Sequence, residues 1–391
     1  MSYYNGYYQV GEKIFQDKLE AILYANQTLA DIRWNFHNDL YKSIDWLTEP
    51  ETSLDEFYKI RAQQIRDKYD YVIIMCSGGG DSTNVLWSFL RNGITVDEVI
   101  AAAPISGLRD WADRTDDIGA ANTITETKLV QLPLMDEISR LHPSVKITIH
   151  DYFQNMINYK TDEWLYRGGE WIHPSSTARY DLENLVHIKN LIEQGKSIGI
   201  VYGIDKPSLA IHEGSIYSVI SDLPINVPRP PFRLEYPNVD VVLFYYTPDL
   251  PLMQVKQSHV AMKNLMLPEH KKGLHCVYDT NNKLFTNATN KVRNGIYERY
   301  IIPFIYPSTY KPIFQGAKPT RNFLGEHDGW FYKLHSSTRT YEMIDSDYRL
   351  FIKNINKKYL NEEGSGGFHM YKNWYSIGKK EDFVKRPAWM I

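Results

Sequence analysis

The sequence has 391 residues, of which 43% are hydrophobic and 23% are charged, and its formal net charge is -3. This length predicts two domains, or one domain with a large addition, and the composition is ordinary for a soluble globular protein. The charge balance gives no reason to expect a polyanion as the main partner, and the sequence contains no evident nucleic-acid-binding patch.

Cysteine content and the lengths of the apolar stretches predict a cytoplasmic location. The two cysteines, Cys76 and Cys276, argue against a disulfide scaffold and suit a reducing compartment. The first residues lack a basic-then-apolar signal pattern. The longest apolar stretches, such as VDVVLFYY, are far shorter than the roughly 20 residues that a bilayer requires. We therefore expect no membrane association, and the sequence leaves the oligomeric state open.

In chain order, the first section is expected to be an N-terminal helical segment over residues 1–68. The stretch KIFQDKLEAILYANQ places Ile14, Leu19, Ile22 and Leu23 on one helical stripe. A second helical pattern, SLDEFYKIRAQQIRDKY, follows an acid-rich break.

The middle section, residues 69–226, alternates strand and helix patterns. The expected strands are residues 71–76, VDEVIAAAPI, VKITIHDY and SIGIVYGID. The expected helices are residues 83–91, about 122–141 with a break near Pro133, and DLENLVHIKNLIEQG. Strands separated by helices predict an α/β domain with a parallel sheet and right-handed crossovers.

From about Val227 this alternation is lost. The stretch VPRPPFRLEYPNVD looks like a linker, and an aromatic-rich section with many prolines follows it. We expect residues 227–391 to form an α+β C-terminal substrate or accessory domain.

Three consecutive glycines lie between the first strand of the middle section and its helix, in the sequence CSGGGDST. Ligands bind outside the carboxyl ends of parallel strands, where loop amides and a helix N-terminus attract phosphate. Glycines let a ligand approach the backbone closely. The alternative is a tight connection without a ligand, which would cost about 2–3 kcal/mol of chain entropy with no compensating contact.

Two common phosphate motifs do not fit this chain. The stretch GGGDST lacks the last glycine of the dinucleotide fingerprint G-x-G-x-x-G. The triplet GKS at 195–197 precedes a strand, whereas the same triplet of a Walker loop follows one.

The remaining pattern is SGGGDS, formed by Ser77, Gly78, Gly79, Gly80, Asp81 and Ser82. It resembles the S-G-G-x-D-S signature of the N-type ATP pyrophosphatases, the PP-loop superfamily of adenine nucleotide alpha-hydrolase-like proteins. The resemblance implies a Rossmann-like fold of HUP type with helices on both faces, and a loop that binds the β- and γ-phosphates of ATP. It also implies that a substrate oxygen attacks the α-phosphate, giving an adenylate and pyrophosphate, and that a nucleophile then displaces AMP.

The resemblance also assigns roles to single residues. The amides and hydroxyls of residues 77–82 would hold pyrophosphate, and Asp81 would brace the loop or hold a magnesium-bound water. Synthetases of the asparagine-synthetase type have a glycine-and-acid motif after a later strand, which here corresponds to Gly203, Asp205 and Lys206 in VYGIDKPS. Asp205 would bind Mg²⁺ and Lys206 would contact phosphate. A surface turn is the alternative, because Asp, Lys and Pro are common in turns. ATP and Mg²⁺ are thus the expected cofactors.

Further substrate contacts are expected from three residues. Arg109 follows the second strand of the middle section. Lys256 and His259 share a helix face at i and i+3 and could bind anionic groups, although a solvated helix face is the alternative. The stretch HKKGLHC contains His270, His275 and Cys276 without a further ligand pair at zinc spacing, which favours a structural or surface role.

The expected function is an ATP-dependent synthetase that activates a carbonyl oxygen for attack by an amine or ammonia, with Asp81, Asp205 and Lys206 as catalytic candidates. Residue 2 is Ser, so the chain does not open as a glutaminase domain does, and it lacks the C-x-x-C of the zinc and iron–sulfur members. It is similar to asparagine-synthetase-like synthetase domains encoded by some bacteriophages. The alternatives are a PP-loop sulfurtransferase acting on a nucleobase and a non-catalytic adenine-nucleotide-binding module. The acceptor, a small molecule or a nucleobase, stays unidentified.

Overall fold

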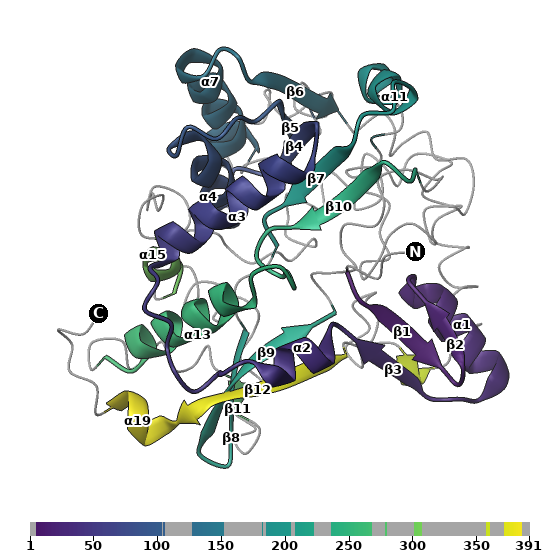
Figure 1. Cartoon of the computed structure of the whole chain (residues 1–391), viewed down its shortest axis with the longest axis vertical. Helices are drawn as coiled ribbons and strands as arrows, with labels where there is room; N and C mark the ends of the chain where they lie inside the picture. Colours follow the sequence, from purple (N-terminus) through teal and green to yellow (C-terminus); the bar gives the residue numbers. More distant parts are fainter. Residues whose placement is uncertain are drawn as a thin grey trace, which may run out of the picture.

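The computed structural model of the chain describes residues 5–103, 105, 127–151, 182, 185–204, 208–222, 236–267, 278–279, 301–306, 357–359 and 371–384. The described strands form three sheets, and Figure 1 shows the largest of them in the upper part of the molecule. Among the helices described, none combines the length and the apolar character needed to cross a bilayer.

The largest sheet has five strands, all parallel, and confirms the expected α/β section. Its strands are β4 (Tyr71–Met75), β5 (Glu98–Ala103), β6 (Lys146–Asp151), β7 (Ile198–Tyr202) and β10 (Val239–Leu243). Their order is β10-β7-β4-β5-β6, so the chain runs outward from β4 to β6 and then returns to the other side of β4. In this Rossmann-like order the direction of progression reverses between β4 and β7.

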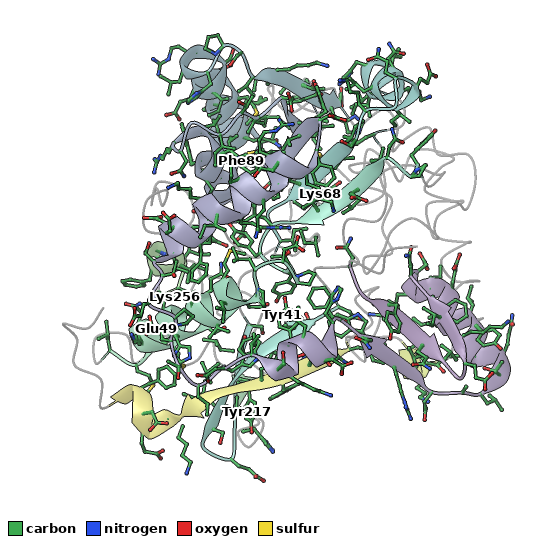
Figure 2. All side chains as sticks on the ribbon, in the orientation of Figure 1. Tyr41, Glu49, Lys68, Phe89, Tyr217 and Lys256 are labelled. Atoms are coloured by element: carbon green, nitrogen blue, oxygen red, sulfur yellow. The ribbon has the colours of Figure 1, made fainter. Side chains whose placement is uncertain are left out.

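Helices flank the parallel sheet, and they begin and end where local chemistry predicts. They are α3 (Leu54–Lys68), α4 (Gly80–Leu90), the π-helix η1 (Thr127–Gln131), α7 (Leu132–Leu141) and α11 (Val186–Glu193). Helix α3 begins at a capping pair, in which Ser53 Oγ accepts the N–H of Glu56 at 3.2 Å. Helix α4 fully buries Val85, Leu86 and Phe89, and Figure 2 labels Phe89 where α3 and α4 meet. The helix expected near 122–141 is confirmed over its described part.

The expectation that residues 1–68 are helical throughout is wrong. This section contains β1 (Tyr7–Val10), β2 (Lys13–Phe15), α1 (Lys18–Thr28), β3 (Ile32–Asn35) and α2 (Asn38–Ser43) before α3. The three strands form an antiparallel sheet in the order β2-β1-β3. Asp17 caps α1 by accepting the N–H of Glu20 at 2.9 Å, so the helix cannot include Ile14. Ile14 lies in β2 with 45% of its surface exposed, whereas Leu19 and Ile22 are buried on α1 as expected.

A second, four-stranded sheet lies at the bottom of Figure 1. Its order is β11-β8-β9-β12, with β8 (Ser208–His212), β9 (Ser215–Ser221), β11 (Tyr278–Asp279) and β12 (Lys372–Lys379). Sheet membership does not follow the expected boundary at residue 226. The β8–β9 hairpin precedes that position but pairs with β12, and β10 follows it but completes the parallel sheet. Alternation along the chain identifies elements, and it does not identify the sheet that a strand joins.

Helix α13 (Pro251–Leu265) links the two larger sheets and contacts α3, β8 and β12 (Figure 1). It is buried on most sides, and its polar residues Gln254, Gln257 and His259 are 0% exposed. The short remaining elements are α15 (Ile302–Ile305), η4 (Lys357–Tyr359) and α19 (Lys380–Val384).

Candidate functional site

The glycine-rich loop lies at the carboxyl end of β4, at the point where the strand order reverses. The N–H of Cys76 donates to the carbonyl of Ile100 at 2.9 Å, which continues the pairing of β4 with β5 by one residue. The chain then turns through Gly78, whose φ is +79°. A residue with a side chain rarely adopts this conformation, so the turn requires glycine. The expected position of the glycine turn, after the first parallel strand and before a helix, is therefore confirmed.

Serine and threonine hydroxyls brace the loop from within. Ser82 Oγ accepts the N–H of Ser77 at 3.2 Å and lies 3.2 Å from Ser77 Oγ. The same hydroxyl donates to the carbonyl of Gly79 at 3.2 Å. Thr83 Oγ1 donates to the carbonyl of Gly78 at 3.2 Å. The hydroxyls therefore bind the carbonyls of Gly78 and Gly79 and the N–H groups of Ser77 and Gly79, which fixes the shape of the loop.

The loop leads directly into the first turn of α4. Gly79 is the N-cap residue, and no side chain caps this turn. Within the described part of the chain, the N–H groups of Gly80 and Ser82 have no hydrogen-bond acceptor. These donors stand at the positive end of the helix dipole, which favours a bound anion.

On the β7 side, Gly203 packs directly against the loop. A Cβ atom at this position would lie 2.8 Å from the carbonyl oxygen of Asp81 and 2.9 Å from the Cα of Ser82. Main-chain atoms cannot yield to such contacts without moving the loop, so the close approach of β7 to α4 depends on glycine. The structure therefore brings Gly203 together with residues 81 and 82, as the sequence predicts.

Two tyrosines from distant parts of the chain donate hydrogen bonds to Asp81. Tyr306 donates to Asp81 Oδ1 at 2.6 Å, and Tyr245 donates to the carbonyl of Asp81 at 2.9 Å. Asn84 Nδ2 donates to the hydroxyl of Tyr245 at 2.9 Å. The rings of Tyr245 and Tyr306 stack with their centroids 5.5 Å apart, and Tyr58 lies 6.1 Å from Tyr306.

The environment of these tyrosines keeps their hydroxyls protonated. Burial and the negative charge of Asp81 raise the pKa of Tyr306 well above its ordinary value. Burial likewise raises the pKa of Tyr245, and the neighbouring groups Tyr58 and Asp81 add to this. Both hydroxyls therefore stay hydrogen-bond donors to Asp81 over the physiological pH range.

The predicted residues Asp205, Lys206 and Arg109 lie outside the described residues. Strand β7 ends at Tyr202, which pairs in register with Met75 at the end of β4. The chain therefore leaves β7 at the same edge of the sheet as the loop.

Lys256 and His259 lie on α13, but their contacts tie that helix to residues 46–50. Lys256 Nζ is 2.9 Å from Glu49 Oε1 and donates to the carbonyl of Pro50 at 2.9 Å. Figure 2 shows Glu49 and Lys256 next to each other. The ring of His259 is buried, and its Nε2 lies 2.9 Å from the carbonyl of Trp46. The alternative of a solvated helix face is wrong at His259, because the ring is buried against Trp46 and the ring of Phe383 on α19.

The described residues contain no group of three or more His, Cys, Asp or Glu side chains that could hold a metal ion. The stretch HKKGLHC lies outside them. The GKS triplet caps the opposite end of the sheet, where Ser197 Oγ donates to Asp70 Oδ2 at 2.8 Å at the amino ends of β4 and β7.

Sequence reasoning missed Tyr245, Tyr306 and Gln131, which all contact the loop or the residue before it. Tyr245 could have been found, because it follows a short apolar strand and so falls at the carboxyl edge of the sheet. Tyr306 and Gln131 carry no such signal in the sequence. Comparison of the chain with protein-family models, with curated proteins and with solved structures gave no match.

Proposed function

We propose that the chain is an ATP-dependent adenylating enzyme of the PP-loop type, which cleaves ATP to AMP and pyrophosphate and joins an amine or ammonia to an activated carbonyl. The observation that carries the proposal is the SGGGDS loop at the strand-order reversal between β4 and β7. Nucleotide phosphates bind at this point in doubly wound sheets. The order β6-β5-β4-β7-β10 also supports the finer assignment to the HUP type of Rossmann-like fold.

The loop geometry supports phosphate binding by main-chain groups. The N–H groups of Gly80 and Ser82 open onto the loop at the start of α4, and the hydroxyls of Ser77 and Ser82 satisfy the loop from inside. Such a site suits the β- and γ-phosphates, which carry most of the charge of ATP. The α-phosphate then stands outside the loop and is open to attack.

The reaction follows from this binding mode. The carbonyl oxygen of the acceptor attacks the α-phosphorus, the bond to the β-phosphate oxygen breaks, and pyrophosphate leaves with that electron pair. An amine then attacks the activated carbon, loses a proton to solvent or a base, and releases AMP. The loop's task is to hold the leaving group and to stabilise the charge that develops on it.

Magnesium fits this site without a cluster of protein ligands. It is usually held by one or two carboxylates together with substrate phosphates, and when bound it neutralises charge on the leaving pyrophosphate. Asp81 supplies a carboxylate within the loop, fixed at Oδ1 by Tyr306. Asp205 would be the second carboxylate, and Lys206 would contact the phosphates.

The test is product analysis of the full chain with ATP, Mg²⁺, ammonia and a metabolite extract, followed by phosphorus NMR. We expect AMP and pyrophosphate. Detection of ADP and orthophosphate as primary products would overturn the assignment. ATP binding without turnover under any supplement would support the non-catalytic nucleotide-binding module instead.

A matched pair of variants connects the activity to the loop. Asp81→Asn and Asp205→Asn keep the shape of the side chain and remove its charge, and we expect activity to fall by orders of magnitude while folding survives. Asp70→Asn is the control, because Asp70 directly precedes β4, at the end of that strand opposite the loop, and contacts Ser197. Equal losses in Asp81→Asn and Asp70→Asn would contradict a role at the loop.

A further inference from the structure

The side chain of Gln131 joins the carboxyl ends of β4 and β5 next to the glycine loop. Gln131 is the last residue of the π-helix η1 and is 2% exposed. Its Nε2 donates to the carbonyl of Cys76 at 2.8 Å and to the carbonyl of Ala102 at 3.3 Å. These carbonyls lie at the carboxyl ends of neighbouring strands, β4 and β5. Both partners are acceptors, so the amide nitrogen is the atom that faces them.

The backbone of Gln131 also sets the space available to the loop. A Cβ atom at Gly78 would lie 2.9 Å from the Cα of Gln131 and 3.0 Å from its nitrogen. It would also lie 3.2 Å from Cγ1 of Val130. The two backbones therefore touch at the residue whose positive φ turns the loop, and the end of η1 fixes where Gly78 can be.

The helix geometry explains how Gln131 reaches this position. A π-turn is rare and inserts an extra residue into a helix, often at a functional site. Here the π-turn comes immediately before α7, whose residues Leu134, Met135 and Ile138 are buried in the core. That packing fixes α7, and Gln131, the residue directly before α7, is held beside the loop.

We infer that Gln131 is a positioning residue of the phosphate loop: it holds Cys76 and Gly78 in the open, ligand-ready conformation before any ligand arrives. It lies on the β4–β5 side of the loop, while Gly203 packs against residues 81 and 82 on the β7 side. The inference rests on the proposed function for the identity of the ligand, and it rests on the contacts of Gln131 alone for the ordering of the loop.

The experiment compares three forms of the full chain: wild type, Gln131→Met and Met135→Ala. Gln131→Met conserves side-chain volume and removes both hydrogen bonds. Met135→Ala is the control, because Met135 is buried on α7 and leaves the Gln131 side chain in place. The readouts are amide hydrogen exchange of residues 76–82 without ligand, and calorimetric affinity for inorganic pyrophosphate and for Mg-ATP. A global unfolding measurement on each form corrects for lost stability.

We expect the loop amides of Gln131→Met to exchange at least tenfold faster than those of wild type, and its affinity for both ligands to fall at least tenfold. In Met135→Ala, the exchange rates of the loop amides and the affinities for both ligands should differ from wild type only by the amount that its lower global stability accounts for. Gln131→Met exchange and affinity equal to those of the control would overturn the inference. If wild type binds neither ligand, the proposed function fails, while loop exchange that is faster only in Gln131→Met would still support Gln131 as the residue that orders the loop.

Discussion

Replacing Tyr306 with Phe tests whether a residue 225 positions away in the sequence positions Asp81 of the loop. The change removes the hydroxyl that donates to Asp81 Oδ1 at 2.6 Å and keeps the ring that stacks on Tyr245. The variant removes a single oxygen atom from a side chain that is 1% exposed, so it leaves no large cavity and exposes no new surface. The measured effect should therefore report the hydrogen bond.

The expected loss of stability is about 1.5 kcal/mol, the lower end of the range for a hydrogen bond to a charged group. The lower end applies because Asp81 is only partly buried, so water can replace the lost donor. The effect should not depend on pH between 6 and 9. Burial and the charge of Asp81 raise the pKa of Tyr306, so its contribution is complete below the ordinary tyrosine pKa and is lost only as the pH rises beyond it.

Urea unfolding of wild type, Tyr306→Phe and Tyr58→Phe measures this contribution, and Mg-ATP calorimetry measures its effect on the site. Tyr58→Phe is the matched control: its hydroxyl is buried in the same cluster but donates to the carbonyl of Ile305 at 2.6 Å. Both variants should lose stability, but only Tyr306→Phe should also lose affinity for Mg-ATP. The reasoning is refuted if the two variants bind Mg-ATP equally well.

Three further predictions concern other parts of the structure. Burial raises the pKa of Glu49, but hydrogen bonds from Lys263 and Lys256 outweigh this effect and lower the pKa overall. Glu49→Gln should therefore lower the free energy of unfolding by about 2 kcal/mol at pH 7. Urea unfolding should show this difference disappearing as the pH falls below the ordinary carboxyl pKa, and a constant difference would contradict it. Gly203→Ala should lower the free energy of unfolding by about 1–3 kcal/mol and weaken Mg-ATP binding, because its Cβ would press on the loop backbone; unchanged values of both would refute the contact. Cys76→Ala combined with Cys276→Ala should still complete turnover past the adenylate, since Cys76 is only 2% exposed; a block at that step would favour sulfur transfer.

Four strands of the parallel sheet were predictable, because they are short apolar runs bounded by turn residues and separated by amphipathic helices; β10 was assigned to the C-terminal section instead. The N-terminal antiparallel sheet was not. Tyr7–Val10 and Lys13–Phe15 are too short to establish an alternating pattern, and the helical stripe that begins at Leu19 extends by chance to Ile14. The decisive signal was Asp17 three residues before Glu20, which marks where the helix begins.

The loop of the candidate site was predictable because glycine, serine and aspartate at fixed spacing report local backbone chemistry. Its supports were not, since Gln131 and Tyr306 reach the loop through tertiary packing. The same limit applies to His259: spacing identifies the face of a helix but cannot say whether that face meets solvent or, as here, side chains from distant parts of the chain. Sequence patterns therefore predicted the groups expected to contact the ligand better than the groups that hold them.

The interleaving of the two larger sheets along the chain has a consequence for biosynthesis. Until β10 has been made, β7 is the edge of the parallel sheet, and it presents the fully apolar residues Ile198, Ile200 and Val201 beside unpaired main-chain groups. Exposed edges of this kind recruit strands from other chains. The β8–β9 hairpin lacks its antiparallel neighbour even longer, until β12 is made near the carboxyl end. A nascent chain therefore carries the open β7 edge until Leu243 has been made and the open β9 edge until β12 (Lys372–Lys379) has been made, so aggregation during synthesis, and dependence on chaperones that cover such edges, should be pronounced for this fold.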